Sequence, residues 1–254
     1  FNGQQYVRYA IDSLLEQTIS DVEFIFVDDG STDSTRSILT EYAKTDTRIV
    51  VLHQMNMGST NSFIRAIQLS KGKYIARQDA DDISNPHRFE AQLDWLQHSK
   101  KRVLCSTNEI LLSEEKGYEY PNKFPISDRN IRKSLPWQNV FSHSSAMYRK
   151  DSYIVVGGYR SFFQYSQDYD LWCRLSQVGE VGNIDKNLIR VHIRKDGVTK
   201  SNSAQQIHFG AIAATLHYAS VRYGYNLVVD KRTNGLVFHK DDKKNRKLVK
   251  HYRA

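Results

Sequence analysis

Hydrophobic positions follow two alternating spacings along the first hundred residues. Residues 3–17 place Val7, Ala10 and Leu14 at steps of three and four, which predicts an amphipathic helix. The run VEFIFV at residues 22–27 is continuously apolar and has the length of a strand that is covered on both faces. The two patterns then repeat, and we predict helices over 34–44, 59–70 and 86–97 and strands over 49–53, 73–78 and 102–106.

This alternation predicts an α/β fold with a Rossmann-like, mostly parallel central sheet and helices on both faces. A helix that begins at residue 3 would normally follow a first strand, so we expect that strand to be absent from this chain. The second half is less regular. There we expect a polar loop over 113–126, helices over 131–135, 169–177 and 205–223, and strands over 143–149 and 187–193.

Composition is that of an ordinary globular protein, because 40% of the 254 residues are hydrophobic and 25% are charged. No run of about 18 apolar residues exists, so we expect no membrane-spanning segment. The first residues lack the basic start and apolar run of a signal peptide. Cys105 and Cys173, the only cysteines, lie in apolar surroundings, which favours reduced thiols in a cytoplasmic protein.

The formal net charge of +8 is unevenly distributed. Residues 240–253 carry seven Lys or Arg residues against two Asp residues. Such a tail can contact an anionic membrane or nucleic acid, or it can simply be solvated. Because nothing else in the sequence indicates nucleic-acid binding, we expect no nucleic-acid partner.

Two clusters of carboxylates follow predicted strands. Asp28 and Asp29 end one strand, and Asp79, Asp81 and Asp82 follow another. In open α/β sheets, ligands bind outside the carboxyl ends of the strands. A divalent cation with oxygen ligands can bridge such carboxylates to a phosphate, whereas the alternative is a solvated acidic turn ahead of a helix. The agreement of two clusters favours a binding site.

Several ordered motifs together resemble those of the family 2 glycosyltransferases, which have the GT-A fold. The motifs are FNG (1–3), VDDGSTDST (27–35), NMG (56–58), GKYIARQDADD (72–82), HSSAMYR (143–149), GGY (157–159), QDYDLWCRL (167–175) and IRVH (189–192). The resemblance covers about residues 1–200. It implies an inverting, metal-dependent transfer of a hexosyl group from a nucleotide sugar, usually a UDP-sugar.

The resemblance also implies roles for the second acidic cluster. Asp79 and Asp81 would contact the ribose and a Mn²⁺ or Mg²⁺ cofactor, with Asp81 the more direct ligand. His192 would be a further metal ligand, or alternatively a hydrogen-bonded histidine within its strand.

For the donor, the resemblance implies that Asp29 accepts a hydrogen bond from uracil, with Asp28 beside it. Helix capping is the alternative for Asp28. Asn56, in the loop before the helix that carries Arg65, would also contribute to donor binding. Arg65 would reach the phosphates, unless it is only a solvated basic residue.

Inversion by single displacement needs one general base near the acceptor hydroxyl. The resemblance assigns this role to Asp168, although relatives commonly have Glu-Asp where this chain has Gln167 before Asp168. Asp170 is a second candidate, though in the family it more often braces the helix. Trp172 would pack in the core or form a wall for the sugar ring.

We divide the chain into a nucleotide-sugar-binding half (1–107), an acceptor-binding and catalytic half (108–200), and a helical extension with a basic tail (201–254). The expected acceptor is a glycan or lipid-linked saccharide of surface polysaccharide or lipopolysaccharide synthesis. We expect a cytoplasmic enzyme, peripheral at the inner face of the membrane. The alternatives are a catalytically weakened carbohydrate-binding or membrane-surface-binding module, and an enzyme that makes nucleotide sugars.

Overall fold

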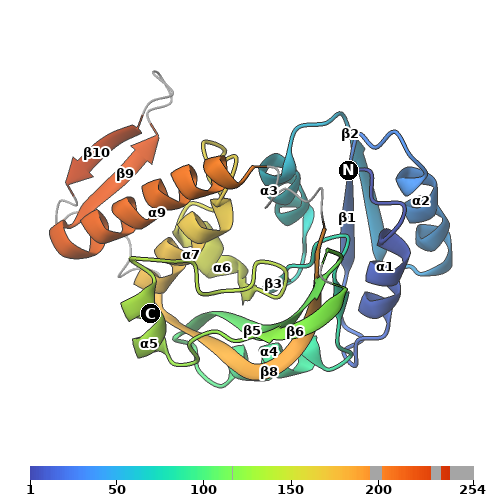
Figure 1. Ribbon diagram of the computed structural model, residues 1–254, viewed down its shortest axis with the longest axis horizontal. Helices are drawn as coiled ribbons and strands as arrows, with labels where there is room; N and C mark the ends of the chain where they lie inside the picture. Colours follow the sequence, from blue (N-terminus) through green and yellow to red (C-terminus); the bar gives the residue numbers. More distant parts are fainter. Residues whose placement is uncertain (116, 195–201, 230–235, 241–254) are drawn as a thin grey trace.

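A computed structural model describes residues 1–115, 117–194, 202–229 and 236–240 (Figure 1). Its described helices are α1 (Val7–Leu15), α2 (Thr35–Thr45), α3 (Ser59–Leu69), α4 (Arg88–Gln97), α5 (Asp128–Ser134), α6 (Lys150–Val155), α7 (Gln167–Val178) and α9 (Ser203–Tyr223). Its described strands are β1 (Phe24–Asp29), β2 (Ile49–Gln54), β3 (Tyr74–Ala76), β4 (Ile83–Ser84), β5 (Arg102–Ser113), β6 (Tyr118–Asn122), β7 (Met147–Arg149), β8 (Glu180–Ile193), β9 (Tyr225–Val229) and β10 (Leu236–Lys240).

The helices of the first half form where the apolar spacing predicts them. In α1 the buried residues are Val7, Ala10, Ile11, Ser13 and Leu14, which lie on one face at steps of three and four. Strands β1, β2, β3 and β5 occupy the predicted strand positions. The alternation of helix and strand up to residue 106 is therefore confirmed.

The main sheet is mixed, so the prediction of a mostly parallel sheet is wrong. Strands β1 and β2 form a parallel pair of their own. The six-stranded sheet has the order β3-β7-β5-β8-β4, with β6 on β5, and only β5 and β8 pair in parallel. Antiparallel strands can pair without a helical crossover between them. A prediction based on the alternation of strands and helices therefore does not reveal such pairs.

Much of the loop expected over residues 113–126 belongs to a β-hairpin instead, whereas residues 123–126 lie outside the strands as predicted. Strand β5 runs on to Ser113, and β6 returns antiparallel beside it, with Glu109 opposite Asn122. Pro121 misled the prediction, because proline usually interrupts a strand. It is tolerated here because β6 pairs only with β5 among the described strands and is therefore an edge strand.

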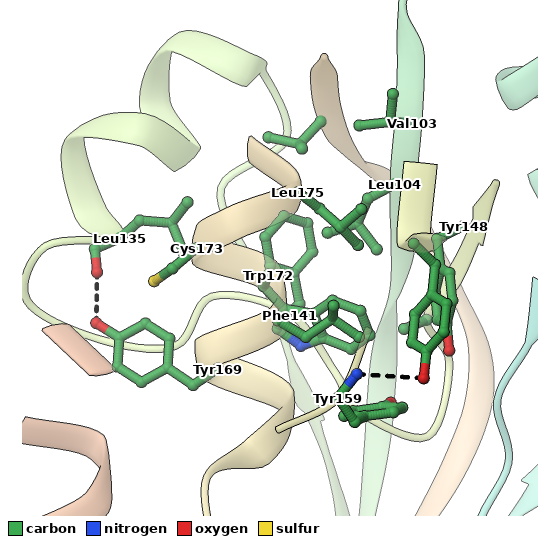
Figure 2. Close-up of a cluster of buried hydrophobic side chains, with 14 of the residues drawn as sticks. Val103, Leu104, Leu135, Phe141, Tyr148, Tyr159, Tyr169, Trp172, Cys173 and Leu175 are labelled. Atoms are coloured by element: carbon green, nitrogen blue, oxygen red, sulfur yellow. Dashed lines mark hydrogen bonds between the residues drawn. The ribbon is translucent and has the colours of Figure 1, made fainter. Parts of the chain in front are cut away.

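Apolar side chains pack on both sides of β5. Leu104 belongs to a cluster with Trp172 and Leu175 of α7 (Figure 2), whereas its neighbour Cys105 belongs to a second cluster with Leu96 of α4. Neighbouring residues of a strand point to opposite faces. The expectation of helices on both faces is therefore confirmed at the centre of the sheet.

Both cysteines are free and buried, as expected. Helix α9 confirms the helix predicted over 205–223, and the antiparallel pair β9 and β10 follows it. Within the described ranges, no helix combines the length and apolar character that crossing a membrane requires. Most of the basic tail, residues 241–254, lies outside the described residues.

Candidate active site

The first pair of predicted donor-binding residues ends strand β1. Asp28 is buried, accepts a hydrogen bond of 3.0 Å from the Ser31 N–H, and lies 3.1 Å from Nδ1 of His53. Burial raises the pKa of Asp28, but the bonds from Ser31 and His53 favour the carboxylate and leave the pKa below its usual range. Asp28 therefore fixes the turn after β1 and makes no hydrogen bond to the described N–H groups of α2.

Asp29 is buried and accepts three hydrogen bonds from its own chain. It accepts hydrogen bonds from Nε2 of Gln54 at 2.6 Å and from the N–H groups of Met57 and Gly58 at 2.8 and 2.9 Å. Burial raises the pKa of Asp29, and these bonds outweigh burial and lower it. Arg65 donates to Oε1 of Gln54 at 2.9 Å, so Gln54 links two of the predicted donor-binding residues.

Asn56 lies in the loop that closes over the end of β1. Gly30 has φ +79°, and a Cβ at this position would lie 2.8 Å from the backbone nitrogen of Asn56. Glycine is therefore required both by the backbone angle and by the close approach of the loop. The turn after β1 and the loop of Asn56 are held together in this way.

Asp79 lies beyond the end of β3 with its side chain 41% exposed. Nη2 of Arg77 lies 2.5 Å from Oδ1, Nδ1 of His143 lies 4.0 Å from Oδ2, and the backbone N–H donates to Oγ of Ser144 at 2.8 Å. Burial raises the pKa of Asp79, but the charge and the hydrogen bond of Arg77 lower it by more, so the pKa lies below its usual value. Asp79 is thus ionised, rigidly held and accessible.

Asp81 and Asp82 experience the charge of Asp79. Burial and then that charge raise the pKa of Asp81, whose side chain is 26% exposed and lies 3.7 Å from Nη1 of Arg194. Asp82 is buried, and the same two causes raise its pKa well above the usual value. It accepts a hydrogen bond of 3.0 Å from the backbone N–H of His192.

Nδ1 of His192, on β8, contacts the carbonyl oxygen of Asp81, which lies in the turn before β4. A carbonyl oxygen can only accept, so Nδ1 carries the proton and Nε2 is the nitrogen left for a ligand. This tautomer is the one that metal-binding histidines commonly adopt when their second nitrogen donates to a carbonyl. The two alternatives for His192 are therefore compatible, because Nδ1 can be hydrogen bonded while Nε2 binds a metal.

Asp168 lies in the first turn of α7, directly after the buried Gln167. Its Oδ2 accepts a hydrogen bond of 2.8 Å from Nδ2 of Asn139. The positive end of the helix dipole also favours a carboxylate at this position. Asp168 is only partly buried, so a substrate hydroxyl can reach it.

Asp170 is buried between two arginines. Nη1 of Arg160 lies 3.2 Å from one carboxylate oxygen and Nη2 of Arg174 lies 2.5 Å from the other. The two arginines pair with both carboxylate oxygens of Asp170, so this residue braces α7 and has no oxygen left to act as a base. Trp172 is fully buried among aromatic rings, so its core interpretation is confirmed (Figure 2).

His143 joins the two halves of the site. Nε of Arg77 donates to its Nε2 at 3.2 Å, and its ring lies 6.4 Å from that of Trp172 on α7. Burial and the charge of Arg77 lower the pKa of His143, against the opposing charges of Asp168 and Asp79. A neutral imidazole thus lies among the carboxylates of both halves.

Sequence reasoning gave no role to Gln54, Arg77, Asn139 and His143. Their partners are distant in the chain, since Arg77 and His143 are 66 residues apart. The available signal was positional: Arg77 is two residues before Asp79, and His143 opens the motif HSSAMYR. A polar residue at the end of an apolar strand indicates a partner, but the sequence does not indicate which one.

The donor set around Asp79 and Asp81 fits a Mn²⁺ or Mg²⁺ ion. Within residues 1–115, 117–194, 202–229 and 236–240, no three His, Cys, Asp or Glu side chains are already gathered as a metal site. Burial and the repulsion from Asp79 raise the pKa of Asp81 and Asp82, and a hard cation would relieve the repulsion. Nε2 of His192, the nitrogen that does not contact the Asp81 carbonyl, would be the further ligand.

The mixed sheet and carboxylate-lined site are those of a glycosyltransferase with the GT-A fold. The model of the family described as "Glycosyl transferase family 2" matches residues 1–157. The chain therefore belongs to glycosyl transferase family 2.

Two relatives are enzymes of bacterial polysaccharide pathways by name. The chain is 30% identical over 196 residues to the amylovoran biosynthesis glycosyltransferase AmsE of Erwinia amylovora, covering 76% of this chain and 73% of that protein. It is also 30% identical over 235 residues to the O-antigen biosynthesis glycosyltransferase WbnJ of Escherichia coli, covering 90% and 86%.

Solved structures share the fold at low sequence identity. Residues 1–349 of S. aureus TarS, crystallised with UDP-GlcNAc, match with a TM-score of 0.65 and 14% identity over 87% of this chain and 70% of that chain. The mannosyltransferase PcManGT of Pyrobaculum calidifontis, in complex with GDP-Man and Mn²⁺, matches with a TM-score of 0.62 and 14% identity over 87% and 72%.

Proposed function

We propose that this enzyme transfers a hexosyl group, with inversion, from a UDP-sugar to a hydroxyl of a glycan or lipid-linked glycan. The observation that carries the proposal is that His143 lies close to carboxylates of both halves: Oδ2 of Asp79 is 4.0 Å from its Nδ1, and the charges of Asp168 and Asp79 both act to raise its pKa. Direct displacement needs a base and a leaving diphosphate on opposite sides of the reacting carbon. A base on α7 and donor-binding carboxylates beyond β3 supply this arrangement.

Asp168 takes the proton of the acceptor hydroxyl as that oxygen attacks the sugar. Asn139 donates to one oxygen of Asp168 and thereby orients the other toward the acceptor. Asp170, tied to two arginines, keeps the first turns of α7 in place. The departing UDP carries negative charge, which Mn²⁺ or Mg²⁺ held by Asp79, Asp81 and His192 would stabilise when bound.

The donor's nucleotide part belongs at the end of β1 in this proposal. Asp29 accepts from uracil beside Asp28, while Asn56 and Arg65 lie toward the phosphates. Two observations support this placement: the closure of the loop of Asn56 over Gly30, and the link from Arg65 through Gln54 to Asp29. The complex of TarS with UDP-GlcNAc supports UDP as the nucleotide.

We place the reaction in surface polysaccharide or lipopolysaccharide synthesis at the inner face of the membrane. The names of the two relatives support this pathway class. The basic residues of the tail provide attraction to an anionic leaflet, at about 1 kcal/mol for each residue near the surface.

A donor screen tests the function. Release of UDP is measured for a panel of UDP-sugars with Mn²⁺ and a mixed set of glycan acceptors, and GDP-mannose serves as the nucleotide control. We expect release that depends on one UDP-sugar and on an acceptor. Binding of saccharides without release from any donor would instead indicate the weakened binding module.

A further inference from the structure

His143 is fixed in position on several sides. The edge of its ring meets Phe63 at 5.4 Å and Trp172 at 6.4 Å between ring centroids. Arg77, whose guanidinium carbon lies 3.8 Å above the Phe63 ring, donates to Nε2 of His143. Such packing leaves the imidazole little freedom to turn.

The contact with Arg77 determines the tautomer of His143. Arginine has only donors, so Nε2 must accept and cannot carry a proton. The ring therefore carries its only N–H proton on Nδ1. This assignment follows from the hydrogen-bond network.

The proton on Nδ1 has no acceptor within the described ranges. Oδ2 of Asp79 lies 4.0 Å from Nδ1, which is longer than a hydrogen bond. The side chain of His143 is 21% exposed, so a ligand can reach it. A rigidly held donor that points at no protein acceptor indicates a contact to substrate.

The position of His143 relative to α7 indicates which part of the substrate His143 would contact. Asp168 and Trp172 are four residues apart and lie on the same face of the helix, one turn from each other. Because His143 contacts Trp172, it lies beside the face that presents Asp168. On its other side it contacts Arg77, the partner of Asp79.

We propose that Nδ1–H of His143 donates a hydrogen bond to a hydroxyl oxygen of the transferred sugar. This inference rests on the proposed function. In a single displacement the transferred ring lies between the leaving diphosphate and the base, and His143 occupies that interval. Arg77 is a positioning residue in this arrangement, because it holds the tautomer through Nε2.

Two substitutions separate the donor at Nδ1 from the acceptor at Nε2. The amide nitrogen of His143→Asn reaches the position of Nδ1, whereas the end of His143→Gln reaches that of Nε2 and can still accept from Arg77. Binding of UDP and of the best UDP-sugar from the donor screen is measured by calorimetry with Mn²⁺. Turnover and thermal unfolding are measured alongside.

We expect His143→Gln to bind UDP as the wild type does but to bind the UDP-sugar about tenfold more weakly, the size of one lost hydrogen bond. His143→Asn should retain most of the sugar affinity. Equal UDP-sugar binding by wild type and His143→Gln would overturn the proposal. So would equal losses of UDP and UDP-sugar affinity in both variants, because they indicate a purely structural role.

The proposal can fail separately from the proposed function. If the wild type released UDP from no donor, the proposed function would fail. The binding measurement, made with UDP and UDP-GlcNAc, would still compare the two variants. If the wild type is active and His143→Gln is equally active, only the assignment of His143 fails.

Discussion

The carboxylate of Asp29 accepts three hydrogen bonds from Gln54, Met57 and Gly58, which fold a loop over the end of β1. The sequence places Asp29 at a strand end, and the structure agrees. The sequence gives no sign that Gln54 connects Asp29 to Arg65, because that contact depends on how the loop after β2 closes. At the residue scale, positions along strands are therefore predictable, whereas partners across loops are not.

Asp29→Asn should destabilise the protein in a pH-dependent way. The folded pKa of Asp29 is lowered, so its stabilising contribution is present above the unfolded value of about 3.9 and is lost as pH falls through the folded value. We expect a loss of about 2 kcal/mol in the free energy of unfolding at neutral pH. The loss should shrink as the pH is lowered.

Denaturant unfolding at several pH values measures this effect, with the exposed Asp21→Asn as the matched control. A loss for Asp29→Asn that is equally large at neutral and acidic pH would contradict the explanation.

Asp81→Ala tests the metal at the residue scale. A divalent cation is expected between the Asp79 and Asp81 carboxylates and the diphosphate, because like charges would otherwise meet. Calorimetry with UDP should show binding that is weaker by at least about tenfold in Mn²⁺ and unchanged in EDTA. Asp94→Ala, an exposed carboxylate on α4, serves as the control. If the wild type bound UDP equally strongly in Mn²⁺ and in EDTA, the metal assignment would be wrong.

Helix α7 shows what can be predicted for a whole element. The spacing of its apolar residues predicts a helix with Trp172 inside, and both features are confirmed. The family resemblance favours Asp168 as the base and Asp170 as a brace, but the sequence does not show which partners each aspartate has. In the structure Arg160 and Arg174 enclose Asp170, and Asn139 meets Asp168.

Asp170→Asn and Asp168→Asn should therefore differ in stability. Removing one partner of a buried ion pair leaves the other charge uncompensated, which costs about 3–5 kcal/mol. We expect a loss of that size for Asp170→Asn and less than about 1 kcal/mol for Asp168→Asn, which remains partly exposed. Thermal and denaturant unfolding measure both variants. Similar stability of the two would mean that the arginine brace contributes little.

The whole molecule is predictable as an α/β fold but not as a mixed sheet. Alternating helices and strands fix the first half, whereas β6 and β7 join the sheet antiparallel. Strand β8 begins at Glu180, seven residues before the predicted strand, because its first residues pair along β5 although they lack an apolar run. Long-range pairing thus extends strands beyond their local signal.

The basic tail carries a prediction for the whole molecule. A chain that ends at Lys240 retains β10 but loses most of the basic residues of the tail. We expect it to sediment less than the full chain with anionic vesicles, and we expect the difference to disappear at high salt because ions screen the attraction. Neutral vesicles provide the control. Equal sedimentation of both chains with anionic vesicles at low salt would show that the tail does not bind membrane.

Asp168 is the proposed base of the sugar transfer, and this role decides the proposed function. The most direct measurement compares wild type and Asp168→Asn for both UDP-sugar binding and turnover. A base contributes about 10²–10⁴-fold, so turnover should fall by at least about a hundredfold while the dissociation constant of the UDP-sugar stays nearly unchanged. Turnover of Asp168→Asn within a few-fold of wild type would contradict the claim.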